Sequence, residues 1–295
     1  MNLRHAASRV TSRSYGLSKR VALTRMRRST RRRNEPPIVV FSMGKTGSTA
    51  VARAAHDATG APVFQVFRLD PAGLAQAEAR YCAGARPPFR GAHHLWESAF
   101  LLRDPPSRAR PWTVITTVRE PIAQAVSAYF HGRDLHGDGS RETAGGAPAP
   151  GALVDAMVAD RWVRTPLRWF DREFAPAFGL DALAQPFDPA AGSAVIETPA
   201  VRVLLLRQES LGIASEALGR FLGRPAPVPV PPRNVAAGRG DVADYRAFLD
   251  AARFPAAVVD EAYASRYARH FYADEEIERF RRRWLEGADR QRNIR

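Results

Sequence analysis

The chain has 295 residues, is 45% hydrophobic and carries 44 basic against 30 acidic side chains, for a net charge of +14. This is enough chain to bury a sizeable core, and one large domain is the expected partition. No stretch approaches the roughly 18 uninterrupted apolar residues of a membrane span, and the first residues lack the apolar segment of a signal peptide. The single cysteine, Cys82, excludes internal disulfides and a cysteine-rich zinc site. We therefore expect a cytoplasmic protein without a transmembrane segment.

The positive charge is concentrated at the start of the chain. Residues 1–33 contain eleven Lys or Arg and no acid, which leaves 33 basic and 30 acidic groups in the remainder. Such a segment repels itself and buries little, so we expect residues 1–34 to be a disordered basic tail. It would contact an anionic membrane surface or nucleic acid, and contact with a membrane would make the protein membrane-peripheral. A merely solvated extension is the alternative. The nearly neutral body argues against specific nucleic-acid binding.

Residues 35–290 have the pattern of a single α/β domain. Three apolar runs, at 36–43, 62–69 and 112–118, are each followed by helical sequence. This alternation predicts βαβ units and a three-layer fold with a central parallel sheet flanked by helices. Two polar segments rich in glycine and proline are predicted loops: 131–151 and 223–240.

The second half of the chain is mostly helical in pattern. Residues 153–178 predict helix, whereas 194–211 predict a hairpin arm followed by a buried strand. The segment 241–286 predicts an amphipathic helix that is interrupted at Pro255. In its last part the acidic residues come first and the basic residues follow, an order that the helix dipole favours. The C-terminal part of the domain is therefore expected to be helical.

The first predicted strand runs directly into the glycine turn MGKTGST. Lys45 in this turn is one of two lysines in a chain that otherwise uses arginine. A glycine turn between a strand and a helix presents backbone N–H groups and the positive helix end, which together bind anions. The GxxxxGK[ST] loop of nucleotide triphosphatases and kinases would need its first glycine where Val39 stands inside the strand. The order Gly-Lys-x-Gly-Ser-Thr is thus a different loop.

This loop resembles the 5′-phosphosulfate loop of sulfotransferases, which use 3′-phosphoadenylyl sulfate (PAPS) as donor. The same family has an Arg-x-Pro element followed by a serine eight residues after the arginine, and WTVITTVREPIAQAVSAYF supplies it with Arg119, Pro121 and Ser127. The guanidinium fork of arginine suits a phosphate, proline suits the first turn of a helix, and the serine falls about two turns on. Two such turns at the ends of parallel strands suit a nucleotide with phosphates at its 5′ and 3′ positions.

Other segments are similar to the same family. VLLLRQESL at 203–211 resembles a stretch found late in many sulfotransferase domains. RWFDREFAPAFGLD, PFDPAAG and RYARHFYADEEIERFRRRW are similar to segments of bacterial sulfotransferase-like proteins of capsular polysaccharide synthesis, so that the resemblance covers most of residues 38–285. That group often carries an Asn-Lys-Trp-Tyr-Ser type segment, of which only Asn234 and a later VADYRAF are present here, separated by a Gly/Arg stretch.

The resemblance implies a P-loop-like fold and transfer of a sulfuryl group from PAPS to a hydroxyl of a carbohydrate or similar acceptor, without a metal and with adenosine 3′,5′-bisphosphate as product. A compact ammonium such as that of Lys45 can follow the bridging oxygen as its bond to sulfur breaks. The implied donor-binding residues are Lys45, Thr46, Gly47, Ser48 and Thr49 at the 5′-phosphosulfate and Arg119 and Ser127 at the 3′-phosphate.

The acceptor hydroxyl must lose a proton, which calls for a general base with a pKa near neutral. GAHHLWE supplies His93, His94 and Glu97 on a predicted short strand or turn after Gly91. Related carbohydrate sulfotransferases use a His or Glu in a comparable place, and His94 is preferred here with His93 as the alternative. As a zinc site the group is poor, because it lacks the helical H-E-x-x-H spacing.

Two other functions are kept as alternatives. One is a P-loop kinase-like phosphotransferase, which the missing glycine spacing disfavours. The other is a non-catalytic protein that binds anionic surfaces through its basic tail. Deletion of residues 1–33 would abolish the function of such a protein, whereas it would leave a sulfotransferase active.

Overall fold

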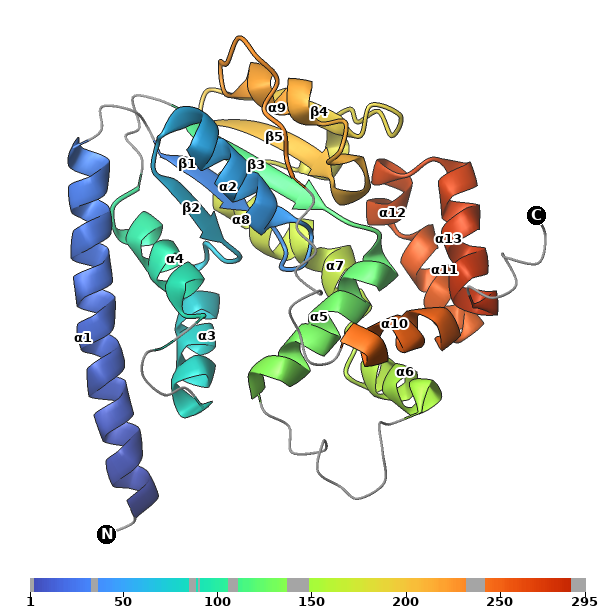
Figure 1. Cartoon of the computed structure of the whole chain (residues 1–295), viewed down its shortest axis with the longest axis horizontal. Helices are drawn as coiled ribbons and strands as arrows, with labels where there is room; N and C mark the ends of the chain where they lie inside the picture. The colour runs from blue at the N-terminus through green and yellow to red at the C-terminus, as the bar shows by residue number, and fades with distance from the viewer. Residues whose placement is uncertain are drawn as a thin grey trace.

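The computed structural model describes residues 3–32, 37–84, 89, 91–105, 111–136, 149–231 and 242–287. Within these ranges the chain builds a five-stranded sheet with the strand order β2-β1-β3-β5-β4 (Figure 1). The strands are β1 (Ile38–Phe41), β2 (Val63–Val66), β3 (Trp112–Val118), β4 (Ser193–Glu197) and β5 (Val201–Arg207). The first three and β5 are parallel, and β4 pairs antiparallel with β5. The predicted α/β fold with a mostly parallel central sheet is confirmed, including the hairpin arm at its edge.

Helices cover both faces of this sheet, because the side chains of its central strands are buried on both sides. On one face Val40, Ile115 and Leu204 pack against α2 (Ser48–Thr59) and α9 (Ser215–Phe221). The opposite face is covered by α4 (His93–Arg103), α5 (Pro121–His136), the helices between residues 150 and 178 and those after residue 242 (Figure 1). The result is three layers, with helices, sheet and helices in that order.

The remaining helices form a large part of the molecule, as the sequence pattern predicted. They are α6 (Pro150–Ala159), α7 (Arg164–Trp169), a π-helical turn (Phe170–Phe174), α8 (Ala175–Phe178), α10 (Val242–Ala251), α11 (Ala256–Ala264), α12 (Arg266–Phe271) and α13 (Asp274–Glu286). The predicted interruption at Pro255 is confirmed, and further breaks occur at Ser265 and Ala273. Among all the helices of the described ranges, none is both long and apolar enough to cross a membrane.

The expected disorder of residues 1–34 is wrong for most of that segment, because α1 (Leu3–Arg32) is a continuous helix beside α4 and α3 (Pro71–Gly84) (Figure 1). Tyr15 and Met26 are buried on its inner side. Lys19 Nζ lies 2.6 Å from a carboxylate oxygen of Glu78. The neutralising carboxylates lie outside α1, on α3 and directly after α4, so the charge of the segment itself gave no sign of them.

Other predicted boundaries also change. The predicted short strand or turn after Gly91 is wrong for His93, His94 and Glu97, because α4 begins at His93 itself. Residues 131–136 are the end of α5 and residues 150–151 the start of α6, and the rest of the predicted loop 131–151 falls mostly on residues 137–148, outside the described ranges. In the predicted loop 223–240 the structure describes residues 223–231, which are neither helix nor strand.

Candidate functional site

The predicted donor-binding residues lie mainly at one edge of the sheet, where the parallel strands β1, β3 and β5 end. The glycine turn follows β1, Arg119 follows β3, and the short 3₁₀ turn Gln208–Ser210 follows β5. In open α/β sheets this carboxyl edge is the usual place for a ligand. The three strands therefore bring to one edge segments that are far apart in the sequence.

The glycine turn has an unusual backbone that neighbouring groups hold in place. Lys45 and Gly47 both have positive φ angles, of 71° and 85°. Thr46 Oγ1 donates to the carbonyl of Met43 at 2.9 Å and lies 2.7 Å from Thr117 Oγ1 on β3, so the Thr117 hydroxyl acts as donor in that second bond. A Cβ at Gly47 would stand 2.7 Å from Leu211 Cδ1, so glycine fits this close approach to the segment after β5.

The turn leads directly into α2, which begins at Ser48. The first N–H groups of a helix have no acceptor inside the helix, and the helix dipole makes this end positive. Lys45 is half-buried beside it, and Thr49 is exposed. Residues 44–49 thus form a concentrated positive end that suits an anionic group.

Arg119 lies in the Arg-x-Pro turn after β3, the second turn of the site, and connects it to the glycine turn after β1, the first. Its Nη1 donates to the carbonyl oxygen of Lys45 at 3.1 Å. Gln124, one turn into α5, donates from Nε2 to the carbonyl of Gly44 at 2.7 Å. Two side chains from the second turn therefore hold the backbone of the first. Ser127 lies one helical turn beyond Gln124 on the same face of α5 and is buried, at 7% exposure.

The backbone of Arg119 is fixed from the opposite side by the C-terminal helices. The hydroxyl of Tyr267 on α12 donates to the carbonyl of Arg119 at 2.7 Å and accepts from its N–H at 3.1 Å. The neighbouring carboxylate of Glu120 accepts from the N–H groups of Ile122 and Ala123 at 2.7 and 2.8 Å, and also from Tyr263 on α11. Burial raises the pKa of Glu120. The second turn is thus built between the sheet and the C-terminal helices.

The predicted base candidates lie on α4 and connect to the glycine turn through β2. His93 Nδ1 lies 2.8 Å from Glu97 Oε1. Glu97 is buried, and its Oε2 accepts from the backbone N–H of Gln65 on the edge strand β2 at 2.7 Å. The side chain of Gln65 donates from Nε2 to Ser48 Oγ at 2.8 Å. A continuous chain of contacts therefore runs from His93 to the first residue of α2.

The two histidines differ in their environment. The hydrogen bond to Glu97 raises the pKa of His93, and this effect outweighs burial, which lowers it. Burial lowers the pKa of His94 to about 4, and its ring lies 4.9 Å from that of Phe67. His93 is held by a carboxylate and is exposed, whereas His94 is half-buried against an aromatic ring. This geometry favours His93 over His94 as an acceptor of protons near neutral pH.

Several residues of this site were not found from the sequence. Glu120 is the middle residue of the Arg-x-Pro element and Gln124 lies between that element and Ser127, and their polar side chains near a helix start were the available signal. Gln65 and Tyr267 carry no such signal, because each is an ordinary polar residue in an apolar pattern until the fold brings it to the site. Within the described ranges no group of three or more His, Cys, Asp and Glu side chains is placed to hold a metal ion.

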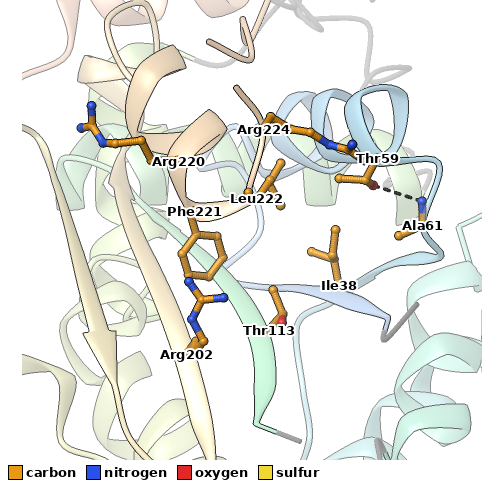
Figure 2. A pocket seen from close by; sticks show the side chains of 10 residues that line it. Ile38, Thr59, Ala61, Thr113, Arg202, Arg220, Phe221, Leu222 and Arg224 are labelled. Atoms are coloured by element: carbon orange, nitrogen blue, oxygen red, sulfur yellow. Dashed lines mark hydrogen bonds between the residues drawn. The ribbon is translucent and has the colours of Figure 1, made fainter. Parts of the chain in front are cut away.

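A separate cavity of about 350 Å³ lies at the opposite edge of the sheet (Figure 2). Its lining includes Ile38 and Thr113, at the amino ends of β1 and β3, together with Arg202 and Arg224. Arg202 is ion-paired at 2.8 Å with Glu197. Because ligands of open α/β sheets bind at the carboxyl ends of the strands, the edge that carries Lys45 and Arg119 remains the candidate site.

Comparisons of the chain with protein-family models, with curated proteins and with solved structures gave no match.

Proposed function

We propose that the protein is a PAPS-dependent sulfotransferase with a P-loop-like fold, which acts on a hydroxyl of a carbohydrate or similar acceptor in cell-surface or capsule polysaccharide biosynthesis. The observation that carries the proposal is the bond from Arg119 Nη1 to the carbonyl of Lys45, at 3.1 Å across 74 residues of sequence. It joins the glycine turn and the Arg-x-Pro turn, which lie at neighbouring strand ends and both suit an anionic group. A nucleotide with phosphates at both its 5′ and 3′ positions needs two such turns side by side.

The donor would lie across these two turns. The N–H groups and hydroxyls of Ser48 and Thr49 would bind the 5′-phosphosulfate, and Gly47 lets the backbone approach it closely. The guanidinium of Arg119 would bind the 3′-phosphate, with Ser127 on the same helix as its second contact. The fit is supported by the left-handed backbone at Gly47 and by the bonds that preorganise Arg119 and the glycine turn.

When bound, PAPS supplies the sulfuryl group and a phosphate leaving group. Lys45 would neutralise the negative charge that develops on the leaving phosphate as its bond to sulfur breaks and the electron pair stays on the phosphate oxygen. A base would take the proton of the acceptor hydroxyl as the acceptor oxygen bonds to sulfur. The products are the sulfated acceptor and adenosine 3′,5′-bisphosphate.

His93 is the base that the geometry supports best. Glu97 occupies its Nδ1, which leaves Nε2 as the atom that would accept the proton from the acceptor. Glu97 also stabilises the imidazolium that forms, as the carboxylate of a catalytic triad does. His94 is the alternative, and its pKa of about 4 makes it a much weaker base.

The test is thermal unfolding of the wild type with adenosine 3′,5′-bisphosphate, with ATP and magnesium, and with buffer alone. A ligand at about 100 times its Kd that binds only the native state stabilises it by about 2.7 kcal/mol, which raises Tm by about 5–10 °C. We expect this shift with the bisphosphate and not with ATP.

Two variants show whether the shift belongs to the proposed site. Arg119→Ala should abolish it. Arg246→Ala removes an exposed arginine of α10 that has no ion pair in the described part of the chain, and it should leave the shift unchanged. No shift at saturating bisphosphate would overturn the proposal, and a shift with ATP alone would indicate a phosphotransferase. A positive result justifies screening carbohydrate acceptors with labelled PAPS.

A further inference from the structure

Helix α1 has an inner and an outer face of different character. On the inner face Tyr15 and Met26 are buried. Lys19 on the inner face and Arg27 at the border between the two faces each lie 2.6 Å from a carboxylate oxygen of the domain. These contacts hold the helix against α3 and α4, so its outer face is part of a fixed surface. Figure 1 shows α1 along one side of the molecule, outside α3 and α4.

The outer face is a stripe of arginines with apolar side chains between them. Arg13, Arg20, Arg28 and Arg31 are exposed and recur at spacings that keep them on one side of a helix. Leu17 and Val21 lie in the same stripe and are 65% and 44% exposed. They are two of the four large hydrophobic side chains that are exposed in the described part of the chain. An exposed pair of this kind inside a basic stripe points to a partner surface.

Within the described ranges no acid is paired with the arginines of this stripe. Residues 3–32 contain no Asp or Glu. None of the four arginines has an ion pair with any described residue, whereas Lys19 and Arg27 do. The four arginines of this stripe are therefore available to an anionic partner on one face of one helix.

We propose that the outer face of α1 binds an anionic membrane surface. The arginines would contact lipid phosphates and carboxylates, and Leu17 and Val21 would enter the boundary between headgroups and acyl chains. A nucleic-acid backbone would be bound by the arginines alone and would leave the two apolar side chains without a partner. The inference does not depend on the proposed sulfotransferase activity, since α1 contains none of the residues of that site.

The experiment is co-sedimentation of the full chain with vesicles of phosphatidylcholine alone and of phosphatidylcholine with phosphatidylserine, each at low and at high salt. We expect binding to the phosphatidylserine vesicles only, weakened by salt. One basic residue near an anionic surface contributes about fivefold to binding, so Arg20→Gln combined with Arg28→Gln should weaken it about 25-fold. Leu17→Ser should weaken it severalfold.

A matched control separates this face from net charge. Arg269→Gln combined with Arg282→Gln makes the same change of charge at two exposed arginines of α12 and α13, and it should bind vesicles like the wild type. Because all substituted side chains are exposed, each variant should unfold at the wild-type temperature. The proposal is overturned by equal binding to both kinds of vesicle, by no binding, or by equal losses in the two double variants. It is also overturned if double-stranded RNA displaces the protein from the vesicles and depends on the same arginines.

Discussion

The buried ion pair between Arg207 and Glu276 gives a prediction whose size follows from the structure. Arg207 ends β5 with its side chain only 3% exposed, and its Nη1 lies 2.9 Å from one oxygen of Glu276 on α13, while its Nη2 donates to the other. Nη1 also donates to the carbonyl of Pro189 at 2.7 Å, and the guanidinium lies 4.6 Å from the centre of the Tyr272 ring. The pair fastens the sheet to the helices that hold the second turn.

Glu276→Gln removes the negative charge and leaves the guanidinium buried without it. Removal of one partner from a buried pair costs about 3–5 kcal/mol. Because Glu276 is 23% exposed, water reduces this cost, and we expect a loss of about 2–3 kcal/mol, or a drop in Tm of about 5–10 °C. Glu278→Gln, which removes the largely exposed partner of Arg281 on the same helix, should cost less than about 0.5 kcal/mol.

The pair also predicts a dependence on pH. Burial raises the pKa of Glu276, but the hydrogen bonds and charge of Arg207 lower it further, so the net shift is downward. A carboxyl whose folded pKa is depressed contributes stability above its ordinary pKa and loses it as the pH falls through the folded value. The difference in stability between wild type and Glu276→Gln should therefore be constant near neutral pH and shrink in acid.

The assay is thermal unfolding followed by circular dichroism from neutral to acid pH. It compares the wild type, Glu276→Gln, Glu278→Gln and the double variant Arg207→Met with Glu276→Leu. The double variant should be more stable than Glu276→Gln, because apolar side chains of similar size replace the whole pair. The reasoning is refuted if Glu276→Gln unfolds within about 1 °C of the wild type, or if its loss of stability equals that of Glu278→Gln.

Three further predictions concern the candidate site. Gly47→Ala should lower the free energy of unfolding by about 1–2 kcal/mol and abolish the Tm shift with the bisphosphate, because φ is 85° and the new methyl group would meet a leucine side chain. Gly44→Ala, with open space at its Cβ, should do neither. Equal effects of the two substitutions in thermal unfolding would contradict this. Glu97→Gln should lower the pKa of His93 and move the acid limb of the activity profile to lower pH, whereas an unmoved limb would exclude His93 as the base. His94 has a folded pKa of about 4, below its ordinary value, so the free energy of unfolding of the wild type should fall by up to about 3 kcal/mol between pH 6.5 and pH 4. In urea titrations His94→Gln should lose less stability over the same range. Equal losses would refute this.

The sequence by itself determined the local parts of this protein. The strand Ile38–Phe41, the left-handed turn at Gly47 and the helix stop at Gly60 follow from β-branched and glycine residues within a few positions. The alternation of apolar runs and helical sequence also predicted the mostly parallel sheet. Because parallel strands end at a common edge, the sequence predicted that the turns with Lys45 and Arg119 would meet.

Only the tertiary structure decided how these turns are held and what the basic segment becomes. The hydroxyl of Tyr267 reaches Arg119 across 148 residues, and Lys19 finds its carboxylate 59 residues away. The link from His93 through Glu97 to the start of α2 also runs through Gln65 of the edge strand β2. Such contacts depend on complementarity between distant segments, which leaves no local pattern of spacing or composition. A segment with eleven basic residues and no acid therefore predicts disorder by itself, yet folds as a helix once its partners lie beside it.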